Sequence, residues 1–260
     1  MAPSSRRLHI DLVAGERLYE PAQLRSVLEP LLQHHTLRPE TWGLSERGGQ
    51  EVDVEAMTRA VDGRPSTRLM SLKRKKALAS EAFVSLGEQP QVVVKVASRD
   101  VSRDGPVCVR LADAMAEVFQ PDIGWVHAFF DNDPPLTDER SLAWWTMDQL
   151  VDGHRRGYGH SGPGGLGMVT YLGVRWAGRL RPALGRVPGV LCEPLAWGGL
   201  RVNLSEAVFD APDDRLADQW RQAMDRVQDQ QVFAKASVRA DGATSFARSP
   251  GFDWPPQYRP

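Results

Sequence analysis

The residues best placed for chemistry are two aspartates that follow an apolar segment. Asp131 and Asp133 come directly after residues 123–130, which the sequence predicts to be a strand. Loops at strand ends often carry catalytic acids, and an Asp-x-Asp pair can hold a hard cation. The competing interpretation is an Asx-type turn before Pro134 and Pro135, and the residues favour it because no further cation ligands are identifiable.

A glycine-rich loop at residues 153–167 is the second candidate for a site. It contains His154 and His160, either of which could act as a general base or a metal ligand. The stretch Gly157–Gly162 matches G-x-G-x-x-G, but a dinucleotide fold needs that motif directly after a strand. Because an arginine-rich, helix-like segment precedes it, we predict a flexible loop, and we expect no cofactor and no metal site.

Composition excludes several broad classes of function. The net charge is −1 and the pI is about 6.6, so a general affinity for nucleic acid or an anionic membrane is not expected. Cys108 and Cys192 lie far apart among apolar residues, a pattern typical of free thiols in a reducing compartment. No segment has the length of apolar sequence that a membrane helix needs, and residues 1–13 do not resemble a secretory leader. We therefore predict a cytoplasmic protein.

The apolar patterning predicts an α+β fold, with a mostly antiparallel sheet and helices packed on one face. Expected strands are residues 8–13, 37–44, 67–73, 81–86, 91–97, 123–130, 168–172, 190–192 and 200–204. Expected helices are residues 21–32, 53–61, 106–119, 138–150, 174–184 and a long one that begins near Asp213. The first strand is predicted to lie at an edge or to be half-buried, and Pro30 to kink or shorten the first helix.

Domain boundaries follow from the same patterning. Residues 1–235 are predicted to form one α+β domain, with an alternative division into two halves of similar size that meet near residues 100–122. Residues 236–260 are polar and rich in glycine and proline, which indicates a loosely ordered tail.

The C-terminal third, residues 167–230, carries a resemblance to a known family. Its marks are Tyr171-Leu172 at a strand end, Gly198-Gly199 between two strands, and the turn Ser205–Asp210 before the last helix. In this order it resembles the immunity protein 52 family and related immunity-like proteins of myxobacteria. Val208 departs from that pattern, since the family favours proline there.

The resemblance implies an antitoxin that binds and neutralises a cognate protein toxin of a polymorphic toxin system by covering its active site. Such toxins are often nucleases, and nucleases present basic clefts, so acidic loops are the expected complement. Asp131, Asp133, Asp138 and Glu139 form the densest acidic cluster in a predicted loop and are our predicted contacts with the toxin. The turn at residues 206–210 is expected to cap and position the last helix.

An enzyme is the alternative hypothesis. Its site would combine the loop at residues 153–167, with His154 and His160, and the turn that carries Asp131 and Asp133. A structural or regulatory module with another partner is a third possibility, which the sequence does not separate from the antitoxin.

Overall fold

The computed structural model describes residues 6–13, 21–45, 49–61, 69–76, 78–85, 90–130, 165–227, 230, 234–238 and 244–248. Within them, one ten-stranded sheet has the order β3-β2-β4-β5-β6-β1-β7-β8-β10-β9. The paired strands all run antiparallel. The strands are β1 Arg6–Val13, β2 Thr41–Gly43, β3 Gln50–Glu51, β4 Leu69–Arg74, β5 Ser80–Ser85, β6 Gln91–Ser98, β7 Ile123–Phe130, β8 Val169–Leu172, β9 Leu191–Pro194 and β10 Leu200–Asn203.

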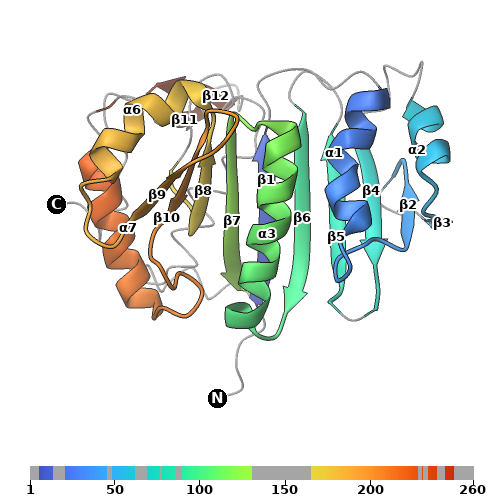
Figure 1. Cartoon of the computed structure of the whole chain (residues 1–260), viewed down its shortest axis with the longest axis horizontal. Coiled ribbons are helices and arrows are strands. Elements are labelled where there is room, and N and C mark those ends of the chain that lie inside the picture. The colour runs from blue at the N-terminus through green and yellow to red at the C-terminus, as the bar shows by residue number, and fades with distance from the viewer. Residues whose placement is uncertain are drawn as a thin grey trace.

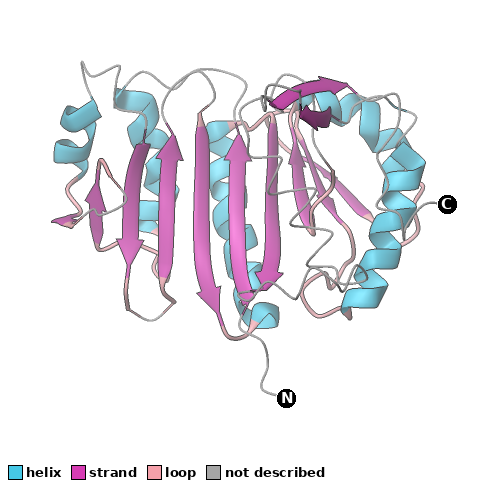
Figure 2. Ribbon diagram, turned by 180° about the vertical axis from the view of Figure 1, so that it is seen from behind, coloured by secondary structure: helices cyan, strands magenta, loops and turns pink. Residues whose placement is uncertain are grey.

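The described helices are α1 Pro21–Gln33, α2 Val54–Val61, α3 Val101–Phe119, α6 Val174–Leu184 and α7 Asp213–Val227. In Figure 1, α1, α2 and α3 lie over one face of the sheet, while α6 and α7 lie at its β9–β10 end. Seen from behind in Figure 2, the central strands lie in front of α1 and α3. These features confirm the predicted α+β fold with an antiparallel sheet. No helix in the described part combines the length and apolar character needed to cross a membrane.

The first strand, β1, occupies the middle of the sheet, so of the two alternatives predicted for it the edge position is wrong. It pairs with β6 on one side and with β7 on the other. Leu8, Ile10 and Leu12 are fully buried on one face, whereas His9 and Asp11 point to the other. The alternation correctly predicted that the two faces of the strand differ. The position of the strand in the sheet depends on its neighbouring strands, which a local sequence pattern does not show.

Of the two effects predicted for Pro30, a shorter helix is wrong, because helix α1 continues to Gln33. Its apolar stripe of Leu24, Val27, Leu28 and Leu31 is only 1–2% exposed. Most helical stability in proteins comes from packing an apolar face, and this packing offsets one hydrogen bond lost at proline.

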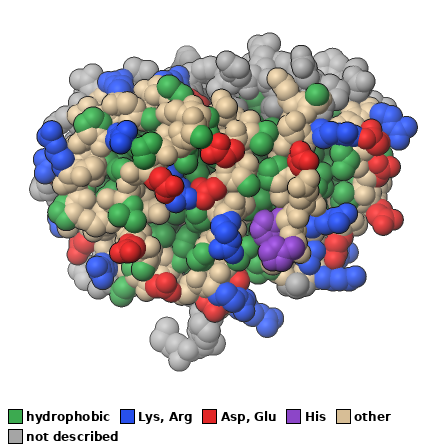
Figure 3. All heavy atoms as spheres, in the orientation of Figure 1, with side chains coloured by type: hydrophobic (Ala, Val, Ile, Leu, Met, Phe, Trp, Pro, Cys, Tyr) green, Lys and Arg blue, Asp and Glu red, His purple; other side chains and the backbone are tan. Residues whose placement is uncertain are grey.

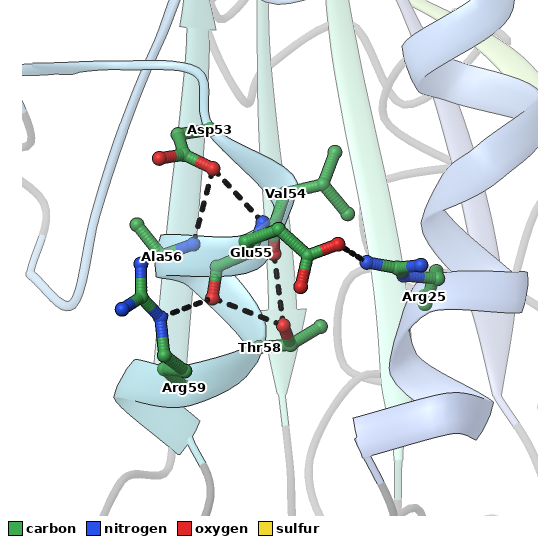
Figure 4. Close-up of polar contacts among 7 residues, drawn as sticks. All are labelled: Arg25, Asp53, Val54, Glu55, Ala56, Thr58 and Arg59. Atoms are coloured by element: carbon green, nitrogen blue, oxygen red, sulfur yellow. Dashed lines mark hydrogen bonds and ion pairs between the residues drawn. The ribbon is translucent and has the colours of Figure 1, made fainter.

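Helix α2 is held by a small polar network at the other end of the sheet (Figure 4). Asp53 Oδ1 accepts hydrogen bonds from the backbone N–H groups of Glu55 (2.9 Å) and Ala56 (3.2 Å), which is N-capping. The Glu55 carboxylate also forms an ion pair with Arg25 of α1. The network therefore joins the short α2 to its neighbouring helix.

Helix α3 begins five residues earlier than the pattern suggested. Asp100 is its N-cap, and its side chain accepts a hydrogen bond from the Arg103 N–H at 3.2 Å. Pro106 therefore lies inside the helix and not at its first position. An aspartate two residues after a strand was the capping signal that identifies this start.

The segment after Phe233, predicted to be a loose tail from residue 236, contains two paired strands. β11 Ala234–Val238 and β12 Thr244–Arg248 form an antiparallel hairpin. The predicted helix at residues 138–150 lies outside the described residues. The division into domains stays a prediction.

Candidate interaction surface

The predicted toxin contacts all lie outside the described residues. Asp131, Asp133, Asp138 and Glu139 fall between residue 130 and residue 165, as do His154 and His160. The acidic-loop interface and the enzyme alternative therefore stay predictions. The residues that carry the family resemblance, by contrast, all lie within the described part of the chain.

The turn at Ser205–Asp210 is held by hydrogen bonds among its own residues. Ser205 Oγ accepts a hydrogen bond from the Ala207 N–H at 3.2 Å, and the Ala207 carbonyl accepts one from the Asp210 N–H at 3.0 Å. The side chains of Glu206 and Asp210 remain exposed. A compact turn thus presents two carboxylates to solvent.

The same turn is packed against the first turns of α3. A Cβ added at Gly105 would lie only 2.3 Å from Cγ of Phe209, so the phenyl ring lies directly over that glycine. Ser102 Oγ donates a hydrogen bond to the Phe209 carbonyl at 3.3 Å. Val208 is 5% exposed, although it stands where the resembled family favours proline. The turn therefore contacts α3, a role that the sequence did not suggest.

A polar network ties α3 to strands β8, β10 and β9. The buried Tyr171 hydroxyl donates to Asp113 Oδ1 at 2.7 Å. Asp113 forms an ion pair with Arg201, whose other terminal nitrogen contacts Glu193 Oε2 at 2.5 Å. The network runs from the buried phenol to an exposed carboxylate on the edge strand.

Burial and charge explain the proton affinities in this network. Burial, and next the charge of Asp113, raise the pKa of Tyr171, so the phenol remains a hydrogen-bond donor. Burial lowers the pKa of Arg201, but the hydrogen bond with Asp113 and the charges of Asp113 and Glu193 outweigh it and raise the value. Arg201 therefore stays a cation held between two carboxylates.

The sequence predicted part of the environment of Arg201, namely the face of the strand on which it lies. Residues 200–204 alternate, and the alternation places Arg201 on the face opposite to Leu200. The structure confirms it, because Leu200 and Val202 are buried while Arg201 is partly exposed. Its partner Asp113 lies 88 residues away along the chain, so no local pattern could reveal the pair.

The edge strand β9 adds an exposed apolar side chain to this region. Leu191 is 44% exposed, and it lies two residues from Glu193 on the same side of the strand. Figure 3 views the molecule from the α3 side and shows apolar, acidic and basic side chains interspersed over this half.

A groove opens beside Leu191. Its volume is about 340 Å³, and it lies between the start of β9, the turn at residues 205–212 and the first half of α7. Its lining residues are Gly189, Leu191, Ser205, Glu206, Ala207, Asp210, Ala211, Pro212, Arg215, Leu216 and Gln219. The turn that marked the family resemblance is thus one wall of a groove.

A second polar group lies on the sheet face that carries His9. Asp11 is 2% exposed, and its Oδ1 accepts a hydrogen bond from Gln91 Nε2 at 2.9 Å. His127, 1% exposed, accepts one from the Met168 N–H at Nδ1 (3.1 Å). Over the residues described, no three His, Cys, Asp or Glu side chains are arranged to hold a metal ion.

Comparison with known proteins identifies a structural neighbour. The chain resembles the Pseudomonas aeruginosa T6SS protein PA0821, with a TM-score of 0.54 and 11% sequence identity, over 86% of this chain and 76% of that one. At this identity the likeness shows a shared fold alone. No family model matches the sequence, the immunity protein 52 family included, and no curated protein matches either. The family resemblance therefore stays an interpretation of the motif.

Proposed function

We propose that this chain is an immunity protein that binds a cognate toxin of a bacterial toxin system and neutralises it. The observation that carries the proposal is the fold shared with a T6SS protein over most of both chains. The order of motifs at residues 167–230 supports the same class of function.

The described architecture suits a protein that acts by binding. A stable interface of ordinary size covers roughly 800 Å² of each partner, and a rigid surface lowers the entropic cost of forming it. Here a ten-stranded sheet supports the surface, and the ion pairs of Arg201 fix side chains at its edge. Neutralisation would follow if the bound protein covers the toxin's active site.

A nuclease is the toxin class that we propose. Nucleases attract nucleic acid with basic clefts, and a carboxylate-bearing surface can compete for the same charges. Exposed carboxylates lie on the described surface at Glu206 and Asp210, and also at Glu193, which is paired with Arg201. Those at Asp131, Asp133, Asp138 and Glu139 remain proposed contacts.

Co-expression is the direct test of neutralisation. The product of the adjacent gene is induced in a bacterial host, with and without this chain, and growth is followed. We expect growth arrest that this chain relieves, whereas an unrelated acidic protein does not. If the neighbouring product is harmless, or if its toxicity is unchanged by this chain, the proposal is wrong.

Purified components test the mechanism. We expect the chain to inhibit nucleic-acid cleavage by the toxin at a one-to-one ratio, and excess substrate to weaken that inhibition by competing for the same cleft. Cleavage that continues in the saturated complex would contradict active-site coverage, and a toxin that cleaves no nucleic acid would contradict the nuclease assignment.

A further inference from the structure

We propose that the groove between β9, the turn at residues 205–212 and α7 receives an extended segment of the toxin in which a lysine or arginine flanks an apolar side chain. This inference rests on the proposed function and deepens it, because it names the contact surface and the chemistry of the segment that fills it.

The apolar part of the groove favours an apolar side chain in the bound segment. Leu191 is 44% exposed at its edge, and Leu216 is buried at its base. An apolar side chain placed against Leu191 would remove the exposed surface of that leucine from water, and burial of apolar surface is the largest favourable contribution to most protein contacts. A volume of about 340 Å³ is large enough for a bulky side chain and part of its backbone.

The charged part of the groove favours a cationic side chain beside that apolar side chain. Glu206 and Asp210 line the groove from the turn, and Arg215 lines it from α7, so the lining carries two carboxylates and one guanidinium. Glu193 lies outside the groove lining and is already paired with Arg201, so the negative charge of the groove comes from Glu206 and Asp210. A lysine or arginine in the bound segment complements this excess of negative charge.

The groove walls are held in place before any partner arrives. Gln219 Nε2 donates a hydrogen bond to the Pro188 carbonyl at 2.5 Å, which joins α7 to the loop before β9. On the other side, Phe209 packs against Gly105 of α3. A preformed groove loses little conformational freedom on binding, so more of the contact energy appears as affinity.

Pairing through the edge of β9 does not explain this surface as well. The strand has four residues and ends at Pro194, which has no backbone N–H to donate. A short edge that ends in proline resists the addition of another strand. Recognition by side chains in the groove is therefore favoured over strand addition by a second copy of the chain.

The test uses the product of the adjacent gene, inactivated at its catalytic residue, and measures its affinity for the full chain by calorimetry. Leu191→Ser removes the apolar contact, and Glu206→Lys reverses a charge in the groove. Val118→Ser is the matched apolar control, since Val118 on α3 is 46% exposed. Glu51→Lys is the charge control, because Glu51 is exposed on β3 at the other end of the sheet.

We expect each groove variant to weaken binding about tenfold or more, while both controls stay within about twofold of the wild type. Raised salt should reduce the difference between Glu206→Lys and the wild type, because screening weakens exposed charges. Circular dichroism confirms that each variant is folded.

Three outcomes would overturn the inference. Groove variants that bind like the controls show that the toxin contacts another surface, and the proposed function then stands without the groove. Wild-type protein that does not bind the toxin contradicts the proposed function itself. If the chain forms a dimer that Leu191→Ser dissociates, the groove is an interface between copies and not a toxin site.

Discussion

Replacing Gly105 with alanine probes the contact between the C-terminal turn and α3. The added Cβ would lie 2.3 Å from Cγ of Phe209 and 2.6 Å from each Cδ. Carbon atoms do not approach this closely, and the atoms concerned are at the base of the ring rather than at a flexible tip. The ring, and with it the turn, must therefore move.

The expected loss of stability follows from two opposing effects. Overpacking of this kind costs about 1–3 kcal/mol. Alanine is favoured over glycine inside a helix by about 1 kcal/mol, but this gain is offset at position 105 because the next residue is Pro106, which disfavours helical backbone in a residue with a Cβ. We expect Gly105→Ala to lower the free energy of unfolding by about 1–3 kcal/mol.

The matched control is Gly178→Ala in α6. Gly178 is exposed inside a helix, and a Cβ there meets no atom within 4 Å. Only the helix preference then applies, and we expect a gain of about 1 kcal/mol. Urea denaturation followed by circular dichroism measures both variants, and in a chain of this size each kcal/mol shifts the melting temperature by about 2–4 °C.

A double-mutant cycle with Phe209→Ala assigns the cause. Without the ring, the alanine at position 105 has space, so the cost of Gly105→Ala should fall close to zero. The coupling between the two sites should be about 1–3 kcal/mol. If Gly105→Ala is as stable as the wild type, or costs the same with and without the ring, the reasoning about this contact is refuted.

Three further predictions concern buried and ionisable groups. Burial, and next the charge of Asp104, raise the pKa of the Cys108 thiol from 9.0 to about 12. The unfolded thiol therefore ionises first, and the wild type should lose stability between pH 9 and pH 12. Denaturation measured across this range should show that Cys108→Ala lacks this part of the loss. His34 Nδ1 accepts a hydrogen bond from the Leu37 N–H at 3.1 Å, and burial, followed by the charges of His35 and Arg110, lowers the pKa of His34. The stability of the fold should therefore fall as the pH drops below 6.5, and His34→Asn should reduce that fall. An NMR titration midpoint of His34 above 6.5 would contradict this prediction. Asp113→Asn leaves the partly buried Arg201 without a main counter-charge and should cost about 1–3 kcal/mol in thermal denaturation, whereas an unchanged melting temperature would show that the pair contributes little.

Local patterns were enough to predict many of the elements and the fold class. The helix at 174–184 was predicted with the bounds that the structure shows, because its apolar stripe, starting after Gly173, is a local property. The strands near 91–97 and 123–130 were equally clear, since each is rich in apolar and β-branched or aromatic residues, interrupted by a single polar residue at Lys95 or His127. Where a local rule was applied too strictly, as at Pro30, the packing of an apolar face prevailed.

The position of the first strand and the candidate surface depended on contacts between distant segments. Nothing near residue 8 indicates that β6 and β7 will flank β1, because sheet order is set by which faces can be buried together. The network of Asp113 and Arg201 joins residues 88 apart. Likewise, the groove exists only because the turn at residues 205–212 folds against α3 and beside β9.

Sequence alone determined the classes of side chain available to this protein and the order of most of the described strands and helices, with β3, β11 and β12 as exceptions. Those follow from periodicity and composition, which are read within a few residues. Tertiary structure decided that Ser205–Asp210 forms a groove wall with exposed carboxylates, and that Leu191 stays in water beside it. Exposure and proximity are properties of the packed chain, since each depends on what the other segments cover.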